Sequence, residues 1–408
     1  MAFDSAKLMP VVELTRTLVA VPSESQQSNV PVMDALASHL EPHGFRMRRY
    51  PQKITHPGSG AKVNMIAERG NGPRRLVFSG HVDTVPVGDE TLWTHDPYGG
   101  DGVLDGRLYG RGSVDMKGAV AAMALACAGA DDVLDELTLV LAITGDEEVG
   151  HMGIKSLASE HVFCDAVGAV VGEPTGFAVY RAHKGGMTVR VTVHGISCHS
   201  SRPSLGVNAI DQAVRLISRL EDGLREWCAQ RHPAFDDEPP TFTVARIRGG
   251  VADNVVPDSC EVNISARALV MDHFEGFREA ILRIIRRIKD EDVAAGVPPE
   301  RQFSADLELI KWAPPMVCET DSAWYRLIAE FAGQDTPRFA RYGTDGGVLG
   351  QVGLPCVIWG PGDIARAHKP DEYVTVKELE EAPRRYGGLI GRVADARLPT
   401  VTTCLWKG

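Results

Sequence analysis

The chain lacks the features that would direct it to a membrane or to nucleic acid. Its most apolar run, from Gly118 to Ala130, is rich in alanine and glycine and falls short of the ~20 residues that a membrane-spanning helix needs. The N-terminal segment carries Asp4, Glu13 and Arg16 among its apolar residues, so it has no uninterrupted apolar core of the kind found in secretory signals. No block of Lys and Arg is present, and the formal net charge is −11. We therefore expect a cytoplasmic protein with no membrane partner and no nucleic-acid partner.

Paired cysteines are also lacking. The eight cysteines lie 30 or more residues apart, and none belongs to a Cys-x-x-Cys pair. This spacing is typical of scattered reduced thiols and argues against both a disulfide framework and a thiolate zinc site. The composition, with 44% hydrophobic and 24% charged residues, is that of an ordinary globular protein. Since 408 residues exceed what one hydrophobic core usually fills, we expect two domains.

What the chain does contain is a set of short polar motifs within apolar or glycine-rich stretches. They are HVDTVP from His81, RGSVDMKG from Arg111, GDEEVG from Gly145, VGEPT from Val171 and AHKPDEY from Ala367. Together they supply the ligands for a pair of divalent cations, with one carboxylate left over to move protons. The motifs therefore predict a metallohydrolase.

Three of these motifs follow short apolar runs that begin at Leu76, Leu137 and Ala166. Such runs, bounded by Gly and Pro, are typical of strands buried on both faces of a parallel sheet that helices cover. In such sheets, ligand groups gather beyond the C-terminal ends of the strands. A fourth run from Leu354 leads towards His368, and a helix is expected over 117–130. The sequence thus predicts an α/β domain with its site at one edge of a mainly parallel sheet.

The pattern changes after Gly185 and Gly186, where apolar and polar residues begin to alternate. Alternation predicts strands with one exposed face, and amphipathic periodicity predicts helices between them. The predicted order is strand 187–194, helix 208–230, strands 241–248 and 259–269, helix 274–293 and strand 303–312. This β-α-β-β-α-β order indicates a ferredoxin-like α+β module. We therefore expect an insertion over 185–313 in a discontinuous domain formed by 1–184 and 314–408.

The residue types suggest how the ligands divide between two cations. Imidazole nitrogen and carboxylate oxygen suit Zn²⁺, Co²⁺ or Mn²⁺, and two adjacent ions need a shared ligand. Asp115, in a glycine-rich turn before the expected helix, suits the shared position. His81 and Glu173 would hold one ion, and Glu148 and His368 would hold the other.

The remaining acids of the motifs receive different roles. Neighbouring side chains on a loop or strand point in different directions, so Glu148 can bind an ion while Glu147 faces the substrate as the general base. Asp83 lies two residues after His81 and is expected to hydrogen-bond its imidazole. A cysteine or serine nucleophile beside His199 is disfavoured because no partner acid is near in sequence. The GTDGG run from Gly343 is either a plain turn or a place where a substrate approaches the backbone.

The motifs HVDTVP, GRGSVDMKG, GDEEVG and AHKPDEY together resemble the acetylornithine deacetylase and succinyl-diaminopimelate desuccinylase family of di-zinc amidohydrolases. The resemblance runs from about Leu8 to Gly391. It implies a zinc-exopeptidase-like catalytic domain that binds two Zn²⁺ ions per subunit, interrupted by a lid that forms the interface of a homodimer. It also implies a cis peptide bond after Asp115.

The resemblance further implies residues that contact the substrate. His199, in SCHSSRPSLGVNAI, matches a lid histidine that reaches the neighbouring subunit's site in this family. Asn254 and Arg267, in NVVPDSCEVNISAR, match positions that contact the substrate carboxylate, a task that suits a guanidinium. A structural ion pair is the alternative for Arg267.

The same resemblance favours N-acetylornithine as the substrate, with release of acetate and a role in arginine biosynthesis. One departure lies at Gly343, Thr344, Asp345 and Gly346, where the deacetylase pattern has Gly-Thr-Glu-Ala and this chain has Gly-Thr-Asp-Gly. If this acid reads the ornithine ammonium, the shorter aspartate permits another N-acyl amino acid. The alternatives are a desuccinylase or dipeptidase of the same family, a metal-free binding protein that has lost catalysis, and a dinuclear phosphatase.

Overall fold

The computed structural model describes residues 10–52, 60–99, 101–402 and 406. Asp4 and Cys404, on which the sequence analysis relied in part, lie outside these ranges. The chain divides into two compact units. The larger unit comprises the residues up to His183, Met316–Ala340 and Thr344 onward, and the inserted unit comprises Lys184–Pro315 and Arg341–Gly343.

The centre of the larger unit is a parallel sheet formed by the four apolar runs that the sequence analysis identified. Strands β6 (Leu137–Thr144), β3 (Arg74–His81), β7 (Ala166–Val171) and β17 (Cys356–Ile358) lie side by side in this order, and each neighbouring pair is parallel. Every residue of β6 and β7 is buried. The prediction of parallel strands covered on both faces is therefore confirmed.

Antiparallel strands extend this sheet on both sides and make it mixed. The sequence pattern did not predict these strands, which are β1 (Arg46–Pro51), β2 (Val63–Arg69), β8 (Tyr180–His183), β15 (Met316–Val317) and β16 (Arg338–Ala340), the last being parallel to β8. Most are short or lack continuous apolar character, so they give a weak periodic signal. The site-bearing strands lie in the interior of the sheet.

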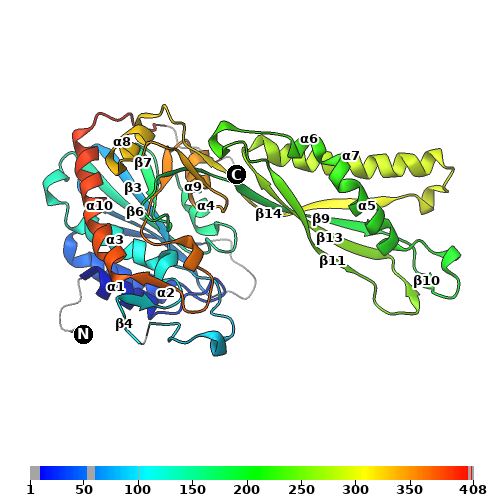
Figure 1. Ribbon diagram of the computed structural model, residues 1–408, viewed down its shortest axis with the longest axis horizontal. Coiled ribbons are helices and arrows are strands. Elements are labelled where there is room, and N and C mark those ends of the chain that lie inside the picture. Colours follow the sequence, from blue (N-terminus) through cyan, green and yellow to red (C-terminus); the bar gives the residue numbers. More distant parts are fainter. Residues whose placement is uncertain (1–9, 53–59, 100, 403–405, 407–408) are drawn as a thin grey trace. The chain divides into compact units, whose positions relative to one another are not determined.

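Helices cover both faces of the sheet, as Figure 1 shows for α10, α3 and α1 on one side and α4 and α9 on the other. The helices are α1 (Pro10–Val19), α2 (Val30–Leu40), α3 (Gly118–Ala128), α4 (Met152–Ser159), α8 (Ala323–Ala332), α9 (Gly346–Gln351) and α10 (Val376–Asp395). Helix α3 confirms the helix expected over 117–130, and its small residues let it lie close to β3, where a Cβ on Gly80 would meet Val120 and Met123 at 3.0 Å. Helix α10 begins with a capping box between Thr375 and Glu378, which fixes the chain directly after the AHKPDEY motif.

The inserted unit has the ferredoxin-like order that the sequence predicted. Its antiparallel sheet has the order β11 (Thr241–Gly249), β13 (Ser259–Ala268), β9 (Gly185–His194), β14 (Ser304–Ala313). Helices α5 (Ala209–Gly223), α6 (Arg225–Cys228) and α7 (Asp272–Ala294) accompany it. The side chains of Val189, Val191 and Val193 are buried, whereas the alternate residues of β9 are only partly buried. One face of this sheet thus carries the core and the other is polar.

One prediction for the inserted unit needs correction. The helix expected over 208–230 breaks at Leu224, which separates α5 from α6. At Gly223, the last residue of α5, a Cβ would meet the side chain of Ile284 in α7 at 2.4 Å. The close approach of α5 and α7 therefore requires glycine there, and glycine favours the end of a helix.

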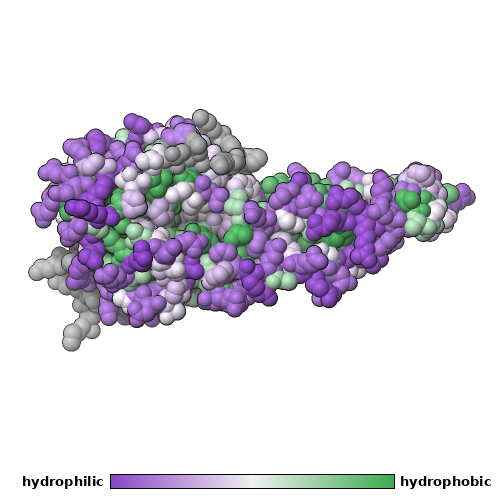
Figure 2. Space-filling view, turned by 90° about the horizontal axis from the view of Figure 1, so that it is seen from above, coloured by the Kyte–Doolittle hydropathy of each residue, from purple (hydrophilic) through white to green (hydrophobic). Residues whose placement is uncertain are grey.

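Short elements complete the fold. They are β4 (Val103–Leu104), β5 (Arg107–Tyr109) and β18 (Tyr373–Thr375), which form a small sheet, and the ribbon of β10 (Cys198–His199) and β12 (Val255–Val256). The face in Figure 2 is mainly hydrophilic, with hydrophobic residues in small separate patches. None of the described helices combines the length and apolar character that a membrane span requires. The seven described cysteines are all free.

Candidate metal centre

The polar motifs meet beyond the C-terminal ends of the parallel strands. His81 is the last residue of β3, Glu147 and Glu148 follow β6, and Glu173 follows β7. Asp115 lies in the turn η4 (Ser113–Lys117) that leads into α3, and the peptide bond after it is cis, as the family resemblance implied. The strand ends therefore bring together residues that are up to about a hundred positions apart, as the rule for parallel sheets predicts.

The first group of possible ligands consists of His81, Asp115 and Glu173. His81 Nε2 lies 3.2 Å from Asp115 Oδ1 and 3.6 Å from Glu173 Oε1. All three residues are buried, and their ligand atoms converge on one point. This group matches the set that the sequence predicted for one cation.

The second group consists of Asp115, Glu148 and His368. His368 Nε2 lies 3.2 Å from Asp115 Oδ2 and 2.9 Å from Glu148 Oε1. The side chain of His368 is 47% exposed, compared with 2% for His81, so this position is the more open of the two. Asp115 directs Oδ1 to one group and Oδ2 to the other, which is the geometry of a shared ligand.

The donor atoms fit two tetrahedral ions. At metal–ligand distances near 2.0 Å, two ligands of one tetrahedral ion lie about 3.3 Å apart. The distances from His81 Nε2 and His368 Nε2 to the carboxylates of their groups, between 2.9 and 3.6 Å, lie close to this value. Imidazole and carboxylate donors suit Zn²⁺, Co²⁺ or Mn²⁺. Glu147 also converges with His81 and Glu148, so it lies beside both groups.

Asp83 organises the site in a different way from the one that the sequence suggested. The His81 ring nitrogen Nδ1 donates to the main-chain oxygen of Asp83 at 2.9 Å, while the Asp83 carboxylate lies farther away at 3.5 Å. This bond leaves Nε2 as the ring nitrogen free to bind an ion. The carboxylate instead accepts from the amides of Glu147 and Glu148, at 3.1 and 3.3 Å, and from the Ser25 hydroxyl at 2.7 Å. Asp83 therefore ties Glu147 and Glu148 to the end of β3.

Glu372 is a supporting residue that the sequence analysis missed, although it lies within the AHKPDEY motif. Its Oε1 accepts from the amides of Val114 and Asp115 at 3.2 and 3.3 Å. Its Oε2 forms a buried ion pair with Arg111 at 2.6 Å. Burial raises the pKa of Glu372 to about 7, and the Arg111 charge opposes this rise. The pair holds the turn that carries Asp115.

Buried charge shifts the pKa values of the site residues. Hydrogen bonds to Asp115 and Glu148 raise the pKa of His368 to about 10. Burial lowers the pKa of His81, but the hydrogen bond to Asp115 and the nearby carboxylates of Asp83 and Glu173 outweigh this and hold it well above its ordinary value. Burial also raises the pKa of Glu173. The cluster therefore favours positive charge among its carboxylates, which divalent cations would supply in place of protons.

Glu147 occupies a buried position between the ligand groups and a histidine. Burial holds its pKa well above the ordinary value, with further increases from Glu173, Glu148 and Asp345 and an opposing effect of His81. His151 Nδ1 lies 3.1 Å from Glu147 Oε1. Sequence reasoning missed His151, although it directly follows GDEEVG. A carboxyl group whose pKa is raised by burial suits a residue that both accepts and returns a proton.

Thr344, Asp345 and Gly346 form a buried turn into α9. The Thr344 hydroxyl accepts from the Gly346 amide at 3.1 Å. The Asp345 carboxylate accepts from the Thr144 hydroxyl at 2.7 Å and contacts His151 at 3.1 Å, and the residue is 2% exposed. Both carboxylate oxygens thus have partners from this chain. Substrate contact through Asp345 stays a prediction, and it would have to break these bonds.

The predicted substrate residues of the inserted unit lie at opposite ends of its sheet. His199 belongs to β10, and the Ser200 amide donates to the Asn254 carbonyl at 3.0 Å, so His199 and Asn254 are neighbours. Arg267 is exposed and lies opposite Gly186, at the other end of β9. Figure 1 shows β10 beyond the far ends of β9 and β13. The strand between the two ends, Gly186 to His194, spans about 26 Å at ~3.3 Å per residue.

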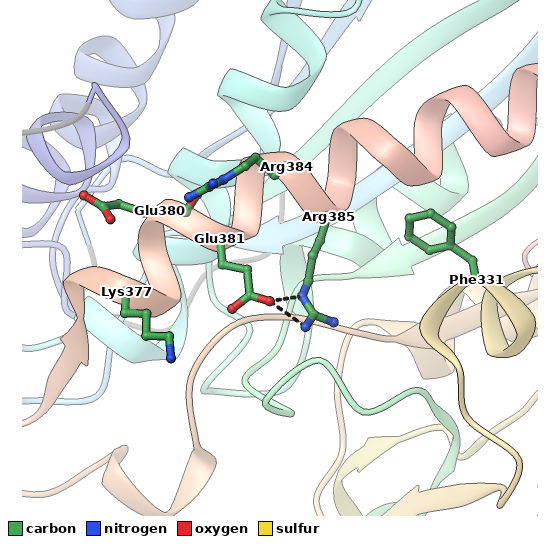
Figure 3. Close-up of a pocket in the computed structure, with 6 residues that line it drawn as sticks. All are labelled: Phe331, Lys377, Glu380, Glu381, Arg384 and Arg385. Carbon is green, nitrogen blue, oxygen red and sulfur yellow. Dashed lines mark hydrogen bonds and ion pairs between the residues drawn. The ribbon is translucent and has the colours of Figure 1, made fainter.

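A separate hollow lies on the outer face of α10. It measures about 480 Å³ and is lined by Phe331, Lys377, Glu380, Glu381, Arg384 and Arg385. Figure 3 shows these charged side chains along one helix, and the Arg385 Nε donates to Glu381 Oε1 at 2.7 Å. None of the six side chains is buried. We assign no function to this hollow, because solvated charges on a helix face need no ligand.

The chain is similar to known proteins over most of its length. It is 33% identical to the acetylornithine deacetylase of Myxococcus xanthus over 380 residues, which cover 91% of this chain and 94% of that relative. Among solved structures, aminopeptidase PepT from Bacillus cereus has a TM-score of 0.73 at 21% identity, covering 95% of this chain and 99% of its own. The YXEP protein of Bacillus subtilis, described as a dinuclear metal binding peptidase from the M20 family, has a TM-score of 0.68 at 16% identity, covering 97% of this chain and 100% of its own.

The two structural matches show the fold, and the closer sequence match shows more. Residues 77–392, from β3 into α10, match Peptidase family M20/M25/M40. This range includes all five polar motifs and the inserted unit. The resemblance seen in the sequence is thereby confirmed, and the chain belongs to Peptidase family M20/M25/M40.

Proposed function

We propose that this chain is a di-metal amidohydrolase that cleaves the amide bond of an N-acyl-L-amino acid, with N-acetylornithine as the first substrate to test. The observation that carries the proposal is the pair of ligand groups that share Asp115 through its two oxygens, with Glu147 beside both. The 33% identity to an acetylornithine deacetylase supports the choice of substrate. The two ions would be Zn²⁺, which Co²⁺ or Mn²⁺ can replace in such a donor set.

When bound, two zinc ions would acidify a coordinated water and polarise the scissile carbonyl group. Glu147 accepts the proton of the attacking water and returns it to the leaving nitrogen, so that acetate and a free α-amine are released. Its raised pKa supports this double role, because the carboxyl group holds a proton more readily in the buried site than in water. Asp83 keeps Glu147 in place through its main-chain amide.

His199, Asn254 and Arg267 hold the substrate in this proposal. The Ser201 amide donates to His199 Nδ1 at 3.1 Å, which leaves Nε2 to carry the proton. An Nε2–H group is the donor that a substrate carbonyl oxygen requires. An Arg267 guanidinium suits the substrate carboxylate. A single N-acyl amino acid cannot bridge the roughly 26 Å of strand between these residues in one chain.

We therefore propose a homodimer through the inserted unit, in which one subunit supplies His199 and Asn254 and the other supplies Arg267. The outer edges of β11 and β14 have no partner strand among the described residues. Most exposed large hydrophobic side chains of the described chain also belong to this unit, including Ile247, Val251 and Leu309. Exposed strand edges and apolar side chains are features that a second copy can cover.

Turnover on a substrate panel tests the proposal. Zinc-loaded and cobalt-loaded protein is assayed with N-acetylornithine, N-succinyl-diaminopimelate, neutral N-acetyl amino acids, dipeptides and a phosphate ester, with Glu147→Gln protein as the control. We expect the fastest hydrolysis with N-acetylornithine. Fastest turnover of another amide would contradict the substrate but not the reaction class. Turnover of the phosphate ester alone would contradict the class.

Metal content provides a second test. We expect two tightly bound transition metal ions per chain by elemental analysis after supply of zinc or cobalt. Less than one ion per chain after this treatment would contradict an enzyme and favour a metal-free binding protein.

A further inference from the structure

His151 contacts Glu147, and Asp345 contacts His151. Neither His151 nor Asp345 is a metal ligand in the proposed function. His151 Nδ1 lies 3.1 Å from Glu147 Oε1 and 3.1 Å from Asp345 Oδ1. Asp345 Oδ2 accepts from the Thr144 hydroxyl at 2.7 Å. Glu147, His151 and Asp345 are 8%, 7% and 2% exposed. The four side chains therefore form one buried, continuous row that ends at the proposed base.

The backbone around His151 turns the imidazole back over Glu147. His151 has φ 58° and ψ 38°, a left-handed conformation that is uncommon for a residue with a Cβ. The His151 amide donates to the Glu147 carbonyl at 3.0 Å, and the Met152 amide donates to the Asp146 carbonyl at 3.1 Å. The turn thus closes between the base and the start of α4, and a helix interior would direct the side chain elsewhere.

The turn is itself held firmly on its other side. Asp146 has φ 59° and forms a buried ion pair with Lys62 at 2.7 Å. Its second oxygen accepts from the Gln52 amide group at 2.9 Å. The Gly145 amide donates to Asn64 Oδ1 at 3.2 Å. The positions of Glu147 and His151 are therefore fixed by contacts on both sides of the motif.

The chemistry of the row depends on the imidazole between two acids. The hydrogen-bond geometry directs Nδ1 to Asp345, while Glu147 Oε1 lies at the same distance from that nitrogen. Without the imidazole, two buried carboxyl groups would face each other, and like charges in a buried site repel strongly. The Asp345 carboxylate is restrained from moving, because its other oxygen accepts a hydrogen bond from the Thr144 hydroxyl. Glu147 would therefore be the group that moves.

We propose that His151, held by Asp345 and Thr144, is a positioning residue that fixes the Glu147 carboxylate for proton transfer. This inference rests on the proposed function, since it takes Glu147 as the general base. In this inference Asp345 holds His151, whereas the sequence comparison had suggested that Asp345 contacts the substrate side chain. The expected effect lies in the chemical step, since the His151 imidazole contacts Glu147 and Asp345 and neither of these is a proposed ligand of the ions.

Two variants with compatible backbones test the role of the imidazole. Glycine and asparagine both tolerate the left-handed conformation at position 151, but only the asparagine amide places a donor near the position of Nδ1. We expect His151→Gly to lower kcat about 10- to 100-fold with KM within about 2-fold, because a displaced base loses alignment with the water. We expect His151→Asn to recover most of the loss. Metal content should equal that of the wild-type protein in both variants.

Either of two kinetic results would overturn the inference. His151→Gly protein with kcat close to the wild-type value would show that Glu147 needs no imidazole. Equal loss of kcat in His151→Gly and His151→Asn would show that the donor is irrelevant. A lower metal content in His151→Gly would show that these residues hold a cation instead, since Glu147, His151 and Asp345 also converge as possible ligands.

A spectroscopic measurement separates this inference from the proposed function. In zinc-loaded protein labelled with ¹⁵N-histidine, we expect the His151 Nδ1 resonance to move in Glu147→Gln and in Asp345→Asn. The exposed Asp34, which pairs with Arg49, supplies the control variant Asp34→Asn, which should leave the resonance unchanged. A resonance that moves with neither acid would overturn the row of contacts. Absence of amide hydrolysis by wild-type protein would contradict the proposed function alone, since the resonance reports the contacts without turnover.

Discussion

The two units of the molecule hold their charged groups in opposite ways. The larger unit buries acids, histidines and basic residues around one sheet edge, namely His81, Asp83, Arg111, Asp115, Lys117, Glu147, His151, Glu173, Asp345 and Glu372. Among the described residues of the inserted unit, the buried charged or histidine side chains are Lys184, His273 and Asp292. Its other described charged side chains are exposed or partly exposed, and many of them lie on α5 and α7.

This difference indicates how each unit is stabilised. A buried charge costs free energy unless a partner or a metal ion compensates it. The larger unit concentrates that cost at the candidate metal centre, so its stability should depend on the charges of the residues there. The inserted unit has a conventional apolar core under a polar sheet face, so its folding should depend little on the metal site.

The largest effect is expected at Glu147. Glu147→Gln should lower amide hydrolysis about 100- to 10,000-fold while metal content stays unchanged, because only the proton carrier is lost. Glu148→Gln is the matched variant, and it should lose bound metal as well as activity. Elemental analysis and turnover are measured on both. If Glu147→Gln loses metal and Glu148→Gln keeps it, the two roles have been exchanged.

A large effect is also expected at His199, in the inserted unit. His199→Ala should lower turnover about 100- to 1,000-fold without loss of metal or of the dimer, because an oxyanion donor is removed. Mixing this variant with Glu147→Gln protein under conditions of subunit exchange should restore about a quarter of wild-type activity, since half the dimers are mixed and each has one intact site.

Mixing separates the two possible origins of His199. If His199 acted within its own chain, no mixed dimer would contain an intact site and activity would not return. Near-normal turnover by His199→Ala alone would show that this residue does not hold the substrate.

A moderate effect is expected at Glu372. Glu372→Gln leaves Arg111 buried without its carboxylate and loosens the turn that carries Asp115. Metal affinity should therefore fall about 10- to 100-fold, as for other residues that orient ligands. Competition with a chromophoric chelator measures it. Glu330→Gln is the control, because Glu330 pairs with Arg392 at an exposed position and contacts no proposed metal ligand. Equal affinity in both variants would contradict the supporting role.

The smallest effect is expected at Asp292 in the inserted unit. Burial alone would raise the pKa of this acid, but bonds from Arg215 and the Phe303 amide outweigh it and lower the pKa. The stabilisation is therefore present above the unfolded pKa near 3.9 and is lost as pH falls through the lower folded pKa. Hydrogen exchange at the Phe303 amide should show protection that falls in acid in the wild-type protein and is weaker, but less pH-dependent, in Asp292→Asn. Unchanged protection of the Phe303 amide in Asp292→Asn would contradict the stabilising role of the Asp292 carboxylate.

The sequence predicted those parts of the fold that a periodic pattern specifies. The runs that became β3, β6, β7 and β17 are continuous and apolar, and the alternation of the inserted unit reports one buried face. The break at Leu224 was missed because α5 and α6 continue the same amphipathic pattern, and the cause lies in Ile284 of the neighbouring helix. Packing between elements leaves no trace in local periodicity.

The candidate site divides in the same way. Residues within the polar motifs, such as His81 and Asp115, could be selected because several motifs coincide at strand ends. His151 could not, since its partner Asp345 is 194 positions away in sequence. Glu372 belongs to one of the predicted motifs, but its role depends on Arg111, which is 261 positions away in sequence. The role of a single acid or histidine depends on residues that contact it in the folded chain. Such contacts between distant positions cannot be inferred from the local sequence.

The length of the sheet in the inserted unit has a consequence for the dependence of activity on protein concentration. If the two substrate-holding ends act on one substrate only when they come from two chains, a solitary chain has a complete ligand set and no complete substrate site. Specific activity should then fall when the protein is diluted below the dissociation constant of the dimer, although every chain keeps its metal. The abundance of the protein would in this way set the activity of each molecule.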